Sequence, residues 1–283
     1  MLKLTYISKN GTAELWGGGK SPLRVTETEG LGLAEKEYQT ASFAGYDGQE
    51  TISARYLQRS ITVSGDVQSG SAREALSKAV EVLMESGYLY ITDGDFKRRI
   101  YCNQTAFPDA KRVLRGKIAT FAIQFVCDSP FFEDAENTVV ALYKRQNNIP
   151  MPFTLPRAFT TTVTGASVNV SSRTAVEPVI EIRFSKAAAA DETIAITNKT
   201  TGKKISLSHT PVKGEIITVD IKSRSIVSSA TGNIIDELTD DTFLSDFKLI
   251  YGENEITVSV GSIYSGITVG CEFNNSYASA LII

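Results

Sequence analysis

The stretch FVCDSPFFED, Phe125–Asp134, places a cysteine beside an aspartate among aromatic and aliphatic residues. A nucleophilic cysteine needs a nearby cation or histidine that lowers the pKa of its thiol. Cys127 instead has Asp128 as its neighbour, and a negative charge raises a thiol pKa. Strand alternation puts Cys127 on the same face as Phe125 and Ile123. We therefore expect Cys127 to pack in a buried layer, and the stretch to mark the boundary between two folded units.

The expected inter-domain boundary consists of Cys127, Pro130, Phe131 and Phe132. Pro130 ends the strand, because proline removes a donor from the ladder of backbone hydrogen bonds. The two phenylalanines are expected to fill the seam between the domains. The acidic residues Glu133–Asp134 then return the chain to solvent.

His209 is the only histidine in the chain, so any Ser-His-Asp or Cys-His arrangement would have to use it. It ends an alternating strand just before Pro211, and is predicted to be a surface residue rather than a general base. Cys102, Cys127 and Cys271 are widely spaced and form no Cys-x-x-Cys motif. They are predicted to be reduced, buried thiols that form neither a zinc site nor a disulfide framework.

Two further runs could bind ligands, a glycine-rich run and an acidic run. GGGKS at residues 17–21 resembles a phosphate loop, but Glu14 occupies the first glycine position and no helix pattern follows. DELTDD, residues 236–241, lacks the alternating acids and central glycine of a calcium loop. We expect a flexible turn and a solvated loop, and we predict no cofactor, no metal and no catalytic residue.

Composition bounds the class of protein. The chain has 283 residues, of which 42% are hydrophobic and 22% charged, and its net charge is -3. A nucleic-acid-binding protein would show a strong basic balance or a basic stripe. The densest basic run, Lys97–Arg99, is predicted to be the solvated face of a hairpin. No apolar run approaches the roughly 18 residues of a membrane helix, and no secretory signal is evident. We expect synthesis in the cytoplasm, no membrane insertion and no sequence-specific nucleic acid partner.

The length predicts two domains, and the first covers residues 1–134. Ser71 and Glu74 form a capping box, and an apolar stripe follows at helical spacing. With Gly87 as the C-terminal stop, one helix is predicted over residues 71–86. The rest of this domain has the alternating patterns and turn residues of β-strands.

The second predicted domain covers residues 135–283 and consists of a linker followed by a β-sandwich. Its strands are short, alternate in hydrophobicity and are separated by glycine-containing turns. They read VIEIRFS, TIAITN, KKISLS, EIITVDI, DFKLIY, NEITVSV and CEFNNSYASALII. The predicted fold class is therefore mainly β, with an N-terminal β-rich domain that carries one α-helix and a C-terminal β-sandwich.

Three groups of segments together resemble one family. The first is RYLQRSITVSGDV followed by SAREALSKAVEVLMESG, and the second is IATFAIQFVCDSPFFED. The third is EPVIEIRF with ITNKTTGKKI, KGEIITVD and DFKLIYGENEITVSV downstream. In this order and spacing, over about residues 50 to 260, the chain resembles the distal tail protein of long-tailed bacteriophages, especially those of Gram-positive hosts.

The resemblance implies a galectin-like C-terminal sandwich and a structural role in the virion. Family members form a hexameric ring at the tail tip, within the baseplate. The ring joins the tail-tube protein above to the tail fibre or tail-associated-lysin hub below, and it can carry receptor-binding proteins. The implied partners are thus other copies of the chain and these tail proteins.

The resemblance also implies an arm that lies over the neighbouring subunit of the ring. The poorly patterned residues 30–50 fit this arm best, with Tyr38, Phe43 and Tyr46 as candidate inter-subunit contacts. The composition of this segment predicts that it is weakly ordered alone and becomes ordered on assembly.

The alternative is a carbohydrate-binding or adhesion module that contacts the host envelope. Fold alone does not establish such a function. A galectin site uses histidines, an arginine and a stacking tryptophan, whereas the second domain has only His209 and no tryptophan. Trp16, Tyr46 and Tyr56 are predicted to pack in the core rather than to stack on sugars or bases. We therefore expect a scaffold sandwich.

Overall fold

The computed structural model describes residues 2–15, 23–45, 47–68, 72–106, 111–113, 118–147, 160–261 and 266–280. The chain divides into two compact units. Unit 1 comprises Met1–Ala135 together with Ser276–Ile283, and unit 2 comprises Glu136–Asn275. The sequence prediction assigned residues 135–283 to one domain, whereas the described residues from Ser276 onward belong to unit 1.

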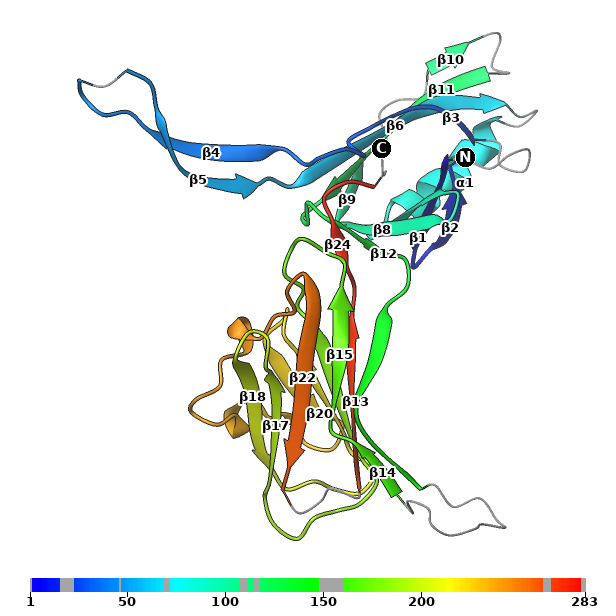
Figure 1. The fold of residues 1–283 in the computed structure, drawn as a ribbon. Helices are drawn as coiled ribbons and strands as arrows, with labels where there is room; N and C mark the ends of the chain where they lie inside the picture. The colour runs from blue at the N-terminus through cyan, green and yellow to red at the C-terminus, as the bar shows by residue number, and fades with distance from the viewer. Residues whose placement is uncertain are drawn as a thin grey trace. The chain divides into compact units, whose positions relative to one another are not determined.

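Unit 1 contains two antiparallel sheets (Figure 1). The six-stranded sheet is built, in spatial order, from β2 (Gly11–Glu14), β1 (Leu2–Ser8), β7 (Gly87–Asp93), β8 (Phe96–Cys102), β12 (Phe132–Asp134) and β24 (Ser276–Tyr277). The second sheet has the order β10 (Lys111–Val113), β11 (Ile118–Cys127), β6 (Arg59–Gln68) and β3 (Leu23–Glu29), with β9 (Gln104–Ala106) also paired to β11.

The core of unit 1 is formed by the alternating buried residues of both sheets. Leu4 and Tyr6 of β1, Ile61 of β6, and Ile123 and Phe125 of β11 belong to one hydrophobic cluster. Each such side chain contributes about 1.5–3 kcal/mol by leaving water. Facing sheets with one shared core explain why period-two patterns dominate this part of the sequence.

One basic residue departs from the sequence prediction. The hairpin β7–β8 turns after Asp93 as expected, but Arg98 is buried and is not part of a solvated face. Arg98 follows the same alternation as Ile100 and Cys102 in β8, which are also buried. The prediction failed because it weighed the charge of the run and not its position on the buried face of the strand.

The helix α1 spans Ala72–Leu83, inside the predicted range of 71–86. Ser71, the proposed cap, lies outside the described residues. Gly87 does not stop the helix as predicted. It lies in β7, where a Cβ atom would come within 2.2 Å of the Ile7 carbonyl oxygen of β1. The glycine is therefore required by the close approach of two strands.

The end of α1 is instead satisfied by side chains from β1 and the turn after it. The Ser8 hydroxyl donates to the Val82 carbonyl oxygen at 2.8 Å, and the Tyr6 hydroxyl donates to the Glu85 carbonyl oxygen at 2.6 Å. The Asn10 side-chain amide donates to the Glu81 carbonyl oxygen at 3.0 Å. Carbonyls that lack a helical partner thus find donors elsewhere in the chain.

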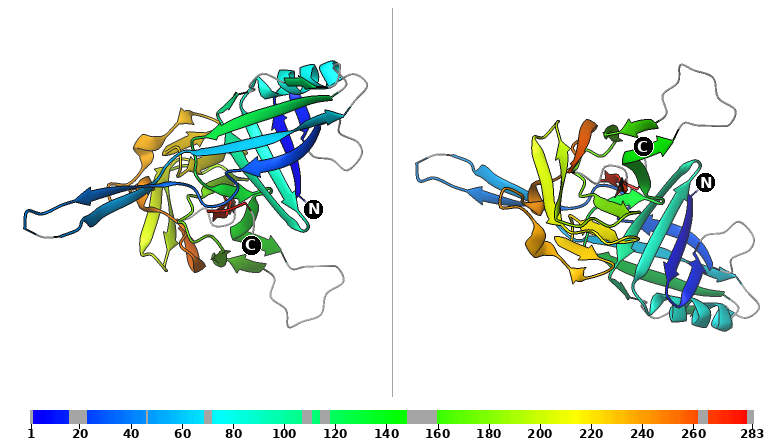
Figure 2. Two further views of the ribbon diagram at one scale, coloured as in Figure 1. Left: turned by 90° about the horizontal axis from the view of Figure 1, so that it is seen from above. Right: turned by 90° about the horizontal axis from the view of Figure 1, so that it is seen from below.

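Strands β4 (Lys36–Ala41) and β5 (Glu50–Tyr56) pair with each other in a two-stranded sheet of their own. We refer to this pair and its turn, residues 36–56, as the arm. Both views of Figure 2 show the arm extending away from the two sheets of unit 1.

Unit 2 is a sandwich of two antiparallel sheets. The seven-stranded sheet has the order β14 (Thr160–Val163), β13 (Thr138–Asn147), β23 (Ile267–Phe273), β16 (Val179–Phe184), β19 (Ile216–Asp220), β20 (Ser225–Ser228) and β21 (Gly232–Asn233). The four-stranded sheet has the order β15 (Gly165–Val170), β22 (Gly252–Val260), β17 (Glu192–Asn198) and β18 (Lys203–His209). Both sheets contribute to a single apolar core.

Five of the seven expected strands lie in the sandwich sheets. CEFNNSYASALII supplies only Cys271–Phe273 to β23, and its Ser276–Tyr277 form β24 of unit 1. DFKLIY, Asp246–Tyr251, is not a strand of either sheet. The short 3-10 helix η1 (Ile235–Glu237) precedes it, and a second, η2 (Leu244–Asp246), ends at its first residue. Leu249 forms an isolated bridge with Val176. Phe247 and Leu249 are fully buried in the core of unit 2, so the apolar alternation of this run reflects burial of a loop. The predicted fold class, mainly β with one described helix and a C-terminal sandwich, is confirmed.

Candidate interaction surface

The arm has two chemically different faces. Residues paired across the strands share a face, and successive residues of a strand alternate between faces. Tyr38 pairs with Ala54 and Lys36 pairs with Tyr56. Ile52, two residues before Ala54 in β5, is left unpaired by a register shift between Gln39 and Thr40, and we group it with these residues as a large exposed apolar side chain. We refer to this side, together with Ile52, as the apolar face of the arm.

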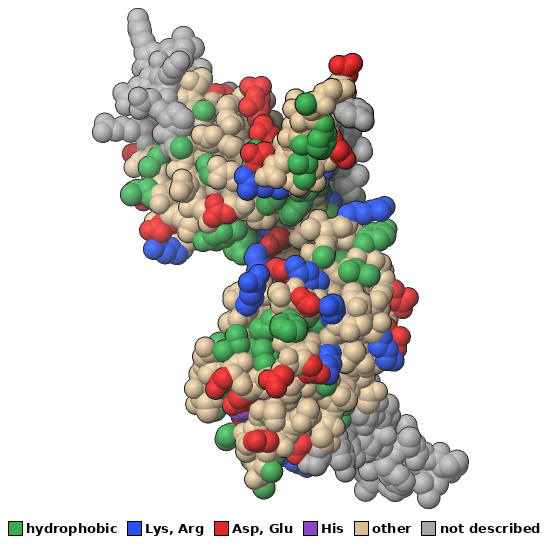
Figure 3. Space-filling model, turned by 90° about the vertical axis from the view of Figure 1, so that its left-hand side faces the viewer, with side chains coloured by type: hydrophobic (Ala, Val, Ile, Leu, Met, Phe, Trp, Pro, Cys, Tyr) green, Lys and Arg blue, Asp and Glu red, His purple; other side chains and the backbone are tan. Residues whose placement is uncertain are grey.

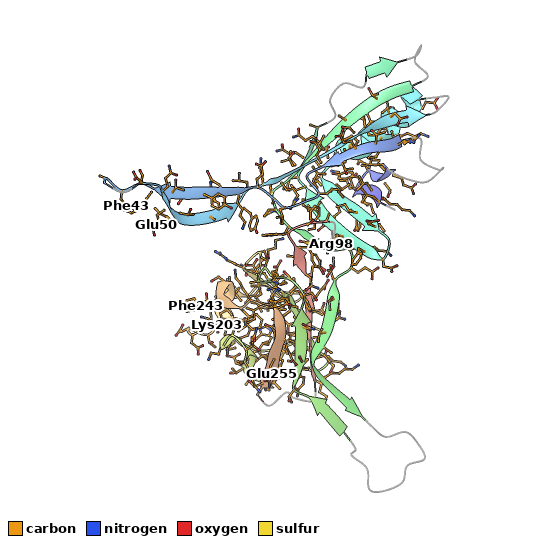
Figure 4. The ribbon with its side chains drawn as sticks, turned by 45° about the horizontal axis from the view of Figure 1, so that its top comes forward. Phe43, Glu50, Arg98, Lys203, Phe243 and Glu255 are labelled. Atoms are coloured by element: carbon orange, nitrogen blue, oxygen red, sulfur yellow. The ribbon has the colours of Figure 1, made fainter. Side chains whose placement is uncertain are left out.

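The apolar face is open to solvent in the isolated chain. Tyr38 is 58% exposed and Ile52 is 70% exposed. Phe43, in the turn, is 57% exposed, and Figure 4 labels it with Glu50 near the tip of the arm. Figure 3 views the molecule from the side toward which the arm projects, and hydrophobic side chains are visible there on its surface. A row of large apolar side chains on a projecting element is typical of a binding surface.

The opposite side of the arm carries polar pairs. The Arg55 guanidinium binds the Glu37 carboxylate at 2.6 Å, and the Ser53 hydroxyl donates to the Gln39 side-chain oxygen at 2.9 Å. All four side chains are exposed. An isolated two-stranded hairpin is marginally stable in water. The arm therefore pairs a solvated face with an apolar face that is exposed in the isolated chain.

Two of the three residues proposed as inter-subunit contacts lie on the described arm. Tyr38 belongs to its apolar face and Phe43 to its turn, whereas Tyr46 lies outside the described residues. The arm also continues past the predicted end at residue 50. Tyr56 is not a core residue as predicted: it is exposed, with its ring 5.1 Å from the Phe131 ring.

The four residues proposed as the domain boundary belong to unit 1. Cys127 is fully buried in β11, and its thiol donates to the Cys102 sulfur at 3.4 Å. This hydrogen bond, together with burial, raises the pKa of Cys102. Phe132 is fully buried in β12, while Pro130 lies in the turn before that strand. Cys102 is therefore held in its protonated form, and both buried thiols are packing residues.

His209 is buried, and the prediction of a surface position is wrong. Its Nε2 lies 2.9 Å from Oε1 of Glu215, and its Nδ1 lies 2.6 Å from Oε2 of Glu237. The Ser228 hydroxyl donates to the same Glu215 oxygen, and the backbone N–H of Val212 donates to the other at 2.7 Å. Strand alternation places His209 after Ile205 and Leu207 on the buried face of β18. That pattern was available in the sequence.

The electrostatics of this cluster favour a charged pair. Burial opposes the charge on His209, but the hydrogen bonds and charges of Glu215 and Glu237 outweigh it and raise the pKa of His209. Burial likewise opposes ionisation of Glu215, yet Ser228, Val212 and His209 together lower its pKa. In a catalytic triad the histidine contacts the serine directly. Here Glu215 lies between them, so the arrangement is that of a structural ion pair.

The other runs considered as ligand sites provide no binding site among the described residues. GGGKS lies outside the described residues, as does Trp16. In DELTDD, Asp241 pairs with Lys204, and this contact lowers the pKa of Asp241. Over the described part of the chain, no cluster of His, Cys, Asp and Glu could hold a metal ion. Among the same residues, no helix has the length and apolar character needed to cross a membrane.

The C-terminal part of the chain matches a known family. Residues 171–277 match the family model described as siphovirus-type tail component, C-terminal domain. These residues are therefore similar to the C-terminal domain of siphovirus-type tail components. The match confirms the resemblance to the distal tail proteins of phages that infect Gram-positive hosts. A search of curated proteins found no match.

Solved structures match over nearly the whole chain. The SPP1 Dit protein, described as a paradigm of the hub adsorption apparatus in phages infecting Gram-positive hosts, aligns with a TM-score of 0.67 at 14% identity. The alignment covers 98% of this chain and 99% of that one. The activated phage P2 baseplate with Ca aligns at 0.51 and 10% identity, and the form with Sr at 0.51 and 9%. Each covers 96% of this chain and 98% of the other. At these identities the likeness establishes the fold, including the galectin-like C-terminal sandwich.

Proposed function

We propose that the chain is a structural ring protein of the phage tail tip, in which the arm of each copy lies against the next copy. The observation that carries this proposal is the uncovered apolar face of the arm, with Tyr38 and Ile52 exposed. The tail-domain match in unit 2 and the whole-chain likeness to a hub protein support the same role.

A ring accounts for the chemistry of the arm. In cyclic assembly one heterologous interface repeats until the rotation closes, so a projecting element on one copy meets a receiving surface on the next. Such an interface needs shape and apolar complementarity rather than tuned titratable groups. The arm supplies both an apolar contact face and, in Arg55 and Glu37, a solvated outer face. The proposed ring is hexameric.

Within the virion, the proposed ring joins the tail-tube protein to the tail fibre or tail-associated-lysin hub and can carry receptor-binding proteins. Its copies are made in the host cytoplasm and act without catalysis. The His209 cluster supports this non-enzymatic role, because its hydrogen bonds are all used to bind β18, Glu215 and Glu237 together. The same burial removes His209 as a sugar ligand, which weakens the alternative of a carbohydrate-binding module.

The experiment compares the two faces of the arm. Tyr38→Ser with Ile52→Ser should abolish assembly, whereas Gln39→Ala with Ser53→Ala on the polar face should leave it intact. Light scattering after size exclusion should give about 184 kDa for six copies of the 30.7 kDa chain, and one-chain mass for the apolar-face variant. Because all four side chains are exposed, neither pair of substitutions should impair folding of the individual chain.

Two outcomes would overturn the proposal. One is an apolar-face variant that assembles as well as the parent chain. The other is a parent chain that stays monomeric at high concentration and binds host cell-wall glycans, which would favour the adhesion module.

A further inference from the structure

Arg59, the first residue of β6, is a buried cation with an unusual set of partners. Its Nε donates to the Pro130 carbonyl oxygen at 2.8 Å, and its Nη2 donates to the Ala278 carbonyl oxygen at 2.7 Å. Its Nη1 donates to the carbonyl oxygens of Gly30 and Gly32 at 2.5 and 2.8 Å. The guanidinium carbon also lies 4.4 Å from the centre of the Phe132 ring. A single planar group thus binds three separate segments of backbone.

Two of those segments matter for the arm. Residues 30–35 lead directly into β4, and we refer to them as the arm base. Residues 276–280 follow unit 2 in the sequence and pack in unit 1, and we refer to them as the return. Arg59 bonds to both, although Ala278 is 219 positions further along the chain.

The arm base and the return also bond to each other. The Ala280 N–H donates to the Leu31 carbonyl oxygen at 2.9 Å, and the Ser279 hydroxyl donates to the same oxygen at 3.2 Å. Leu31 and Ala280 are both buried in the core of unit 1. The return therefore contacts the arm base through the backbone as well as through Arg59.

A second buried arginine holds the other side of the return. The Arg98 guanidinium lies 4.0 Å from the centre of the Tyr277 ring, and its Nη1 donates to the Ser279 carbonyl oxygen. Figure 4 labels Arg98 next to the red return strand. Tyr277 pairs with Phe132 in the sheet, and burial with a hydrogen bond to Asp134 raises its pKa to about 12. The return is thus fixed in unit 1 on both sides.

The backbone of the arm base leaves little freedom. Gly30 has φ +82°, and a Cβ atom there would lie 2.1 Å from the Ser60 carbonyl oxygen, next to Arg59. Only glycine adopts this conformation at so close an approach. The Leu57 N–H donates to the Glu35 carbonyl oxygen at 2.9 Å and closes the base where the arm begins.

We propose that Arg59 and the return together form a clamp that positions the arm. This proposal rests on the proposed function of the arm as the contact to a second copy. The five donors of a guanidinium lie in one rigid plane, so its acceptors hold one another in a fixed arrangement. If the return leaves, a buried donor of Arg59 and the Leu31 carbonyl lose their partners, and the arm base loosens. Arg59 is thus a positioning residue for assembly, and it contacts no neighbouring copy itself.

The test is amide hydrogen exchange measured by mass spectrometry on monomeric chains. The background is the Tyr38→Ser, Ile52→Ser variant, so that assembly cannot protect any amide. Arg59→Met should accelerate exchange of the Ala280 and Leu57 amides by about tenfold or more, while amides of the β7–β8 hairpin keep their rates. The matched control is Arg55→Met, which removes an exposed arginine of the arm and should leave both reporter amides unchanged.

A second substitution tests coupling from the opposite end. Tyr277→Ala removes the ring beneath Arg98 and should accelerate exchange at Leu57, although Tyr277 lies outside the arm. Arg59→Lys should behave like Arg59→Met, because one ammonium cannot replace the planar fork. In the parent background, Arg59→Met should raise the concentration needed for half-assembly by about tenfold.

The results separate this proposal from the function of the arm. If Arg59→Met leaves the Ala280 and Leu57 amides unchanged, or accelerates all amides of unit 1 equally, the clamp is wrong. If those amides respond as expected but the apolar-face variant still assembles, the clamp stands as a structural device and the arm is not the contact between copies.

Discussion

Two hairpins of similar length in this molecule have opposite surroundings. In unit 2, β17 and β18 pair over seven residues each, and alternate residues of both strands are buried. In the arm, all seven residues of β5 are exposed, as are the first five of β4. The sandwich hairpin packs its apolar face on a sheet of the same chain. The arm has an apolar face of the same kind, and none of the described elements of the chain covers it.

This difference indicates where the stabilising contact for each hairpin comes from. An antiparallel pair needs a third layer to be stable, because two strands alone bury too little apolar area. The sandwich hairpin obtains that layer during folding. On the proposed function, the arm obtains that layer during association. Its apolar residues should then be dispensable for the monomer and essential for the assembly.

Truncating one apolar residue in each hairpin tests most directly whether only the sandwich hairpin belongs to a folded core. Leu207→Ala in β18 should lower the free energy of unfolding of unit 2 by about 2–5 kcal/mol, because it leaves a cavity in a packed core. Ile52→Ala in the arm should change it by less than about 0.5 kcal/mol in the monomer. Urea denaturation of monomeric protein measures both. Equal losses would show that the arm is part of a folded core.

A second pair of substitutions compares the two glycines of the arm base. Gly30→Ala should destabilise unit 1 by about 2–4 kcal/mol, because the new methyl group meets the Ser60 carbonyl and φ is positive. Gly32→Ala should cost less than about 1 kcal/mol, since nothing lies within 4 Å of its Cβ position. Thermal unfolding of both variants checks this contrast, and similar melting temperatures would contradict it.

The pH dependence of unit 2 should follow its buried cluster. The pKa of His209 is raised from its ordinary 6.5, so its stabilising contribution is full below that pH and is lost as pH rises through the raised value. The pKa of Glu215 is lowered from 4.5, so its contribution is present above that pH and is lost as pH falls through the lowered value. The cluster should therefore stabilise unit 2 most between about pH 4.5 and 6.5.

His209→Ala tests this window. It should lower the free energy of unfolding by about 1–3 kcal/mol at pH 5.5, because Glu215 keeps its burial and loses a partner. The loss should be smaller at a second pH above the raised pKa of His209, where the parent histidine is neutral. Urea midpoints at the two pH values provide the measurement. Arg55→Met on the arm is the control and should give the same small change at both, and a pH-independent loss for His209→Ala would refute a charged pair.

The smallest expected effect concerns the buried thiols. Cys127→Ser should destabilise unit 1 by about 1–2 kcal/mol, because a hydroxyl is buried where the Cys102 sulfur is only a weak acceptor. Assembly should be unchanged, since this site lies in the core and not on the arm. Cys271→Ser, at a buried site in unit 2, should give a similar loss. Light scattering and denaturation together distinguish a packing role from any role in assembly.

Much of the fold could be predicted because most strands have one buried face. Alternation identified the strands of the sandwich, and helical spacing identified α1. DFKLIY was predicted to be a strand for the same reason and is a buried loop, since alternation records burial and not pairing. The arm gave the weakest signal, because neither of its faces is buried in the monomer and its residues show no core pattern.

The polar residues of the core were missed for a different reason. Arg59, Arg98 and His209 each occupy a buried position that continues the alternation of apolar residues in their strands. A charged or polar residue type suggests that a side chain is exposed to solvent, whereas the position of these three residues in their strands indicates burial. All three side chains are buried. Their partners could not be predicted, because contacts such as Arg59 to Ala278 join residues 219 positions apart.

Arg59 and Ala278 are 219 positions apart, so the arm is synthesised well before the return. A ribosome adds about 5–20 residues per second, so synthesis of the arm is complete roughly 10–45 s before Ala278 is added. If the clamp acts as proposed, the arm base lacks one of its contacts throughout that interval. The arm of a nascent chain would then not yet be positioned for contact with another copy.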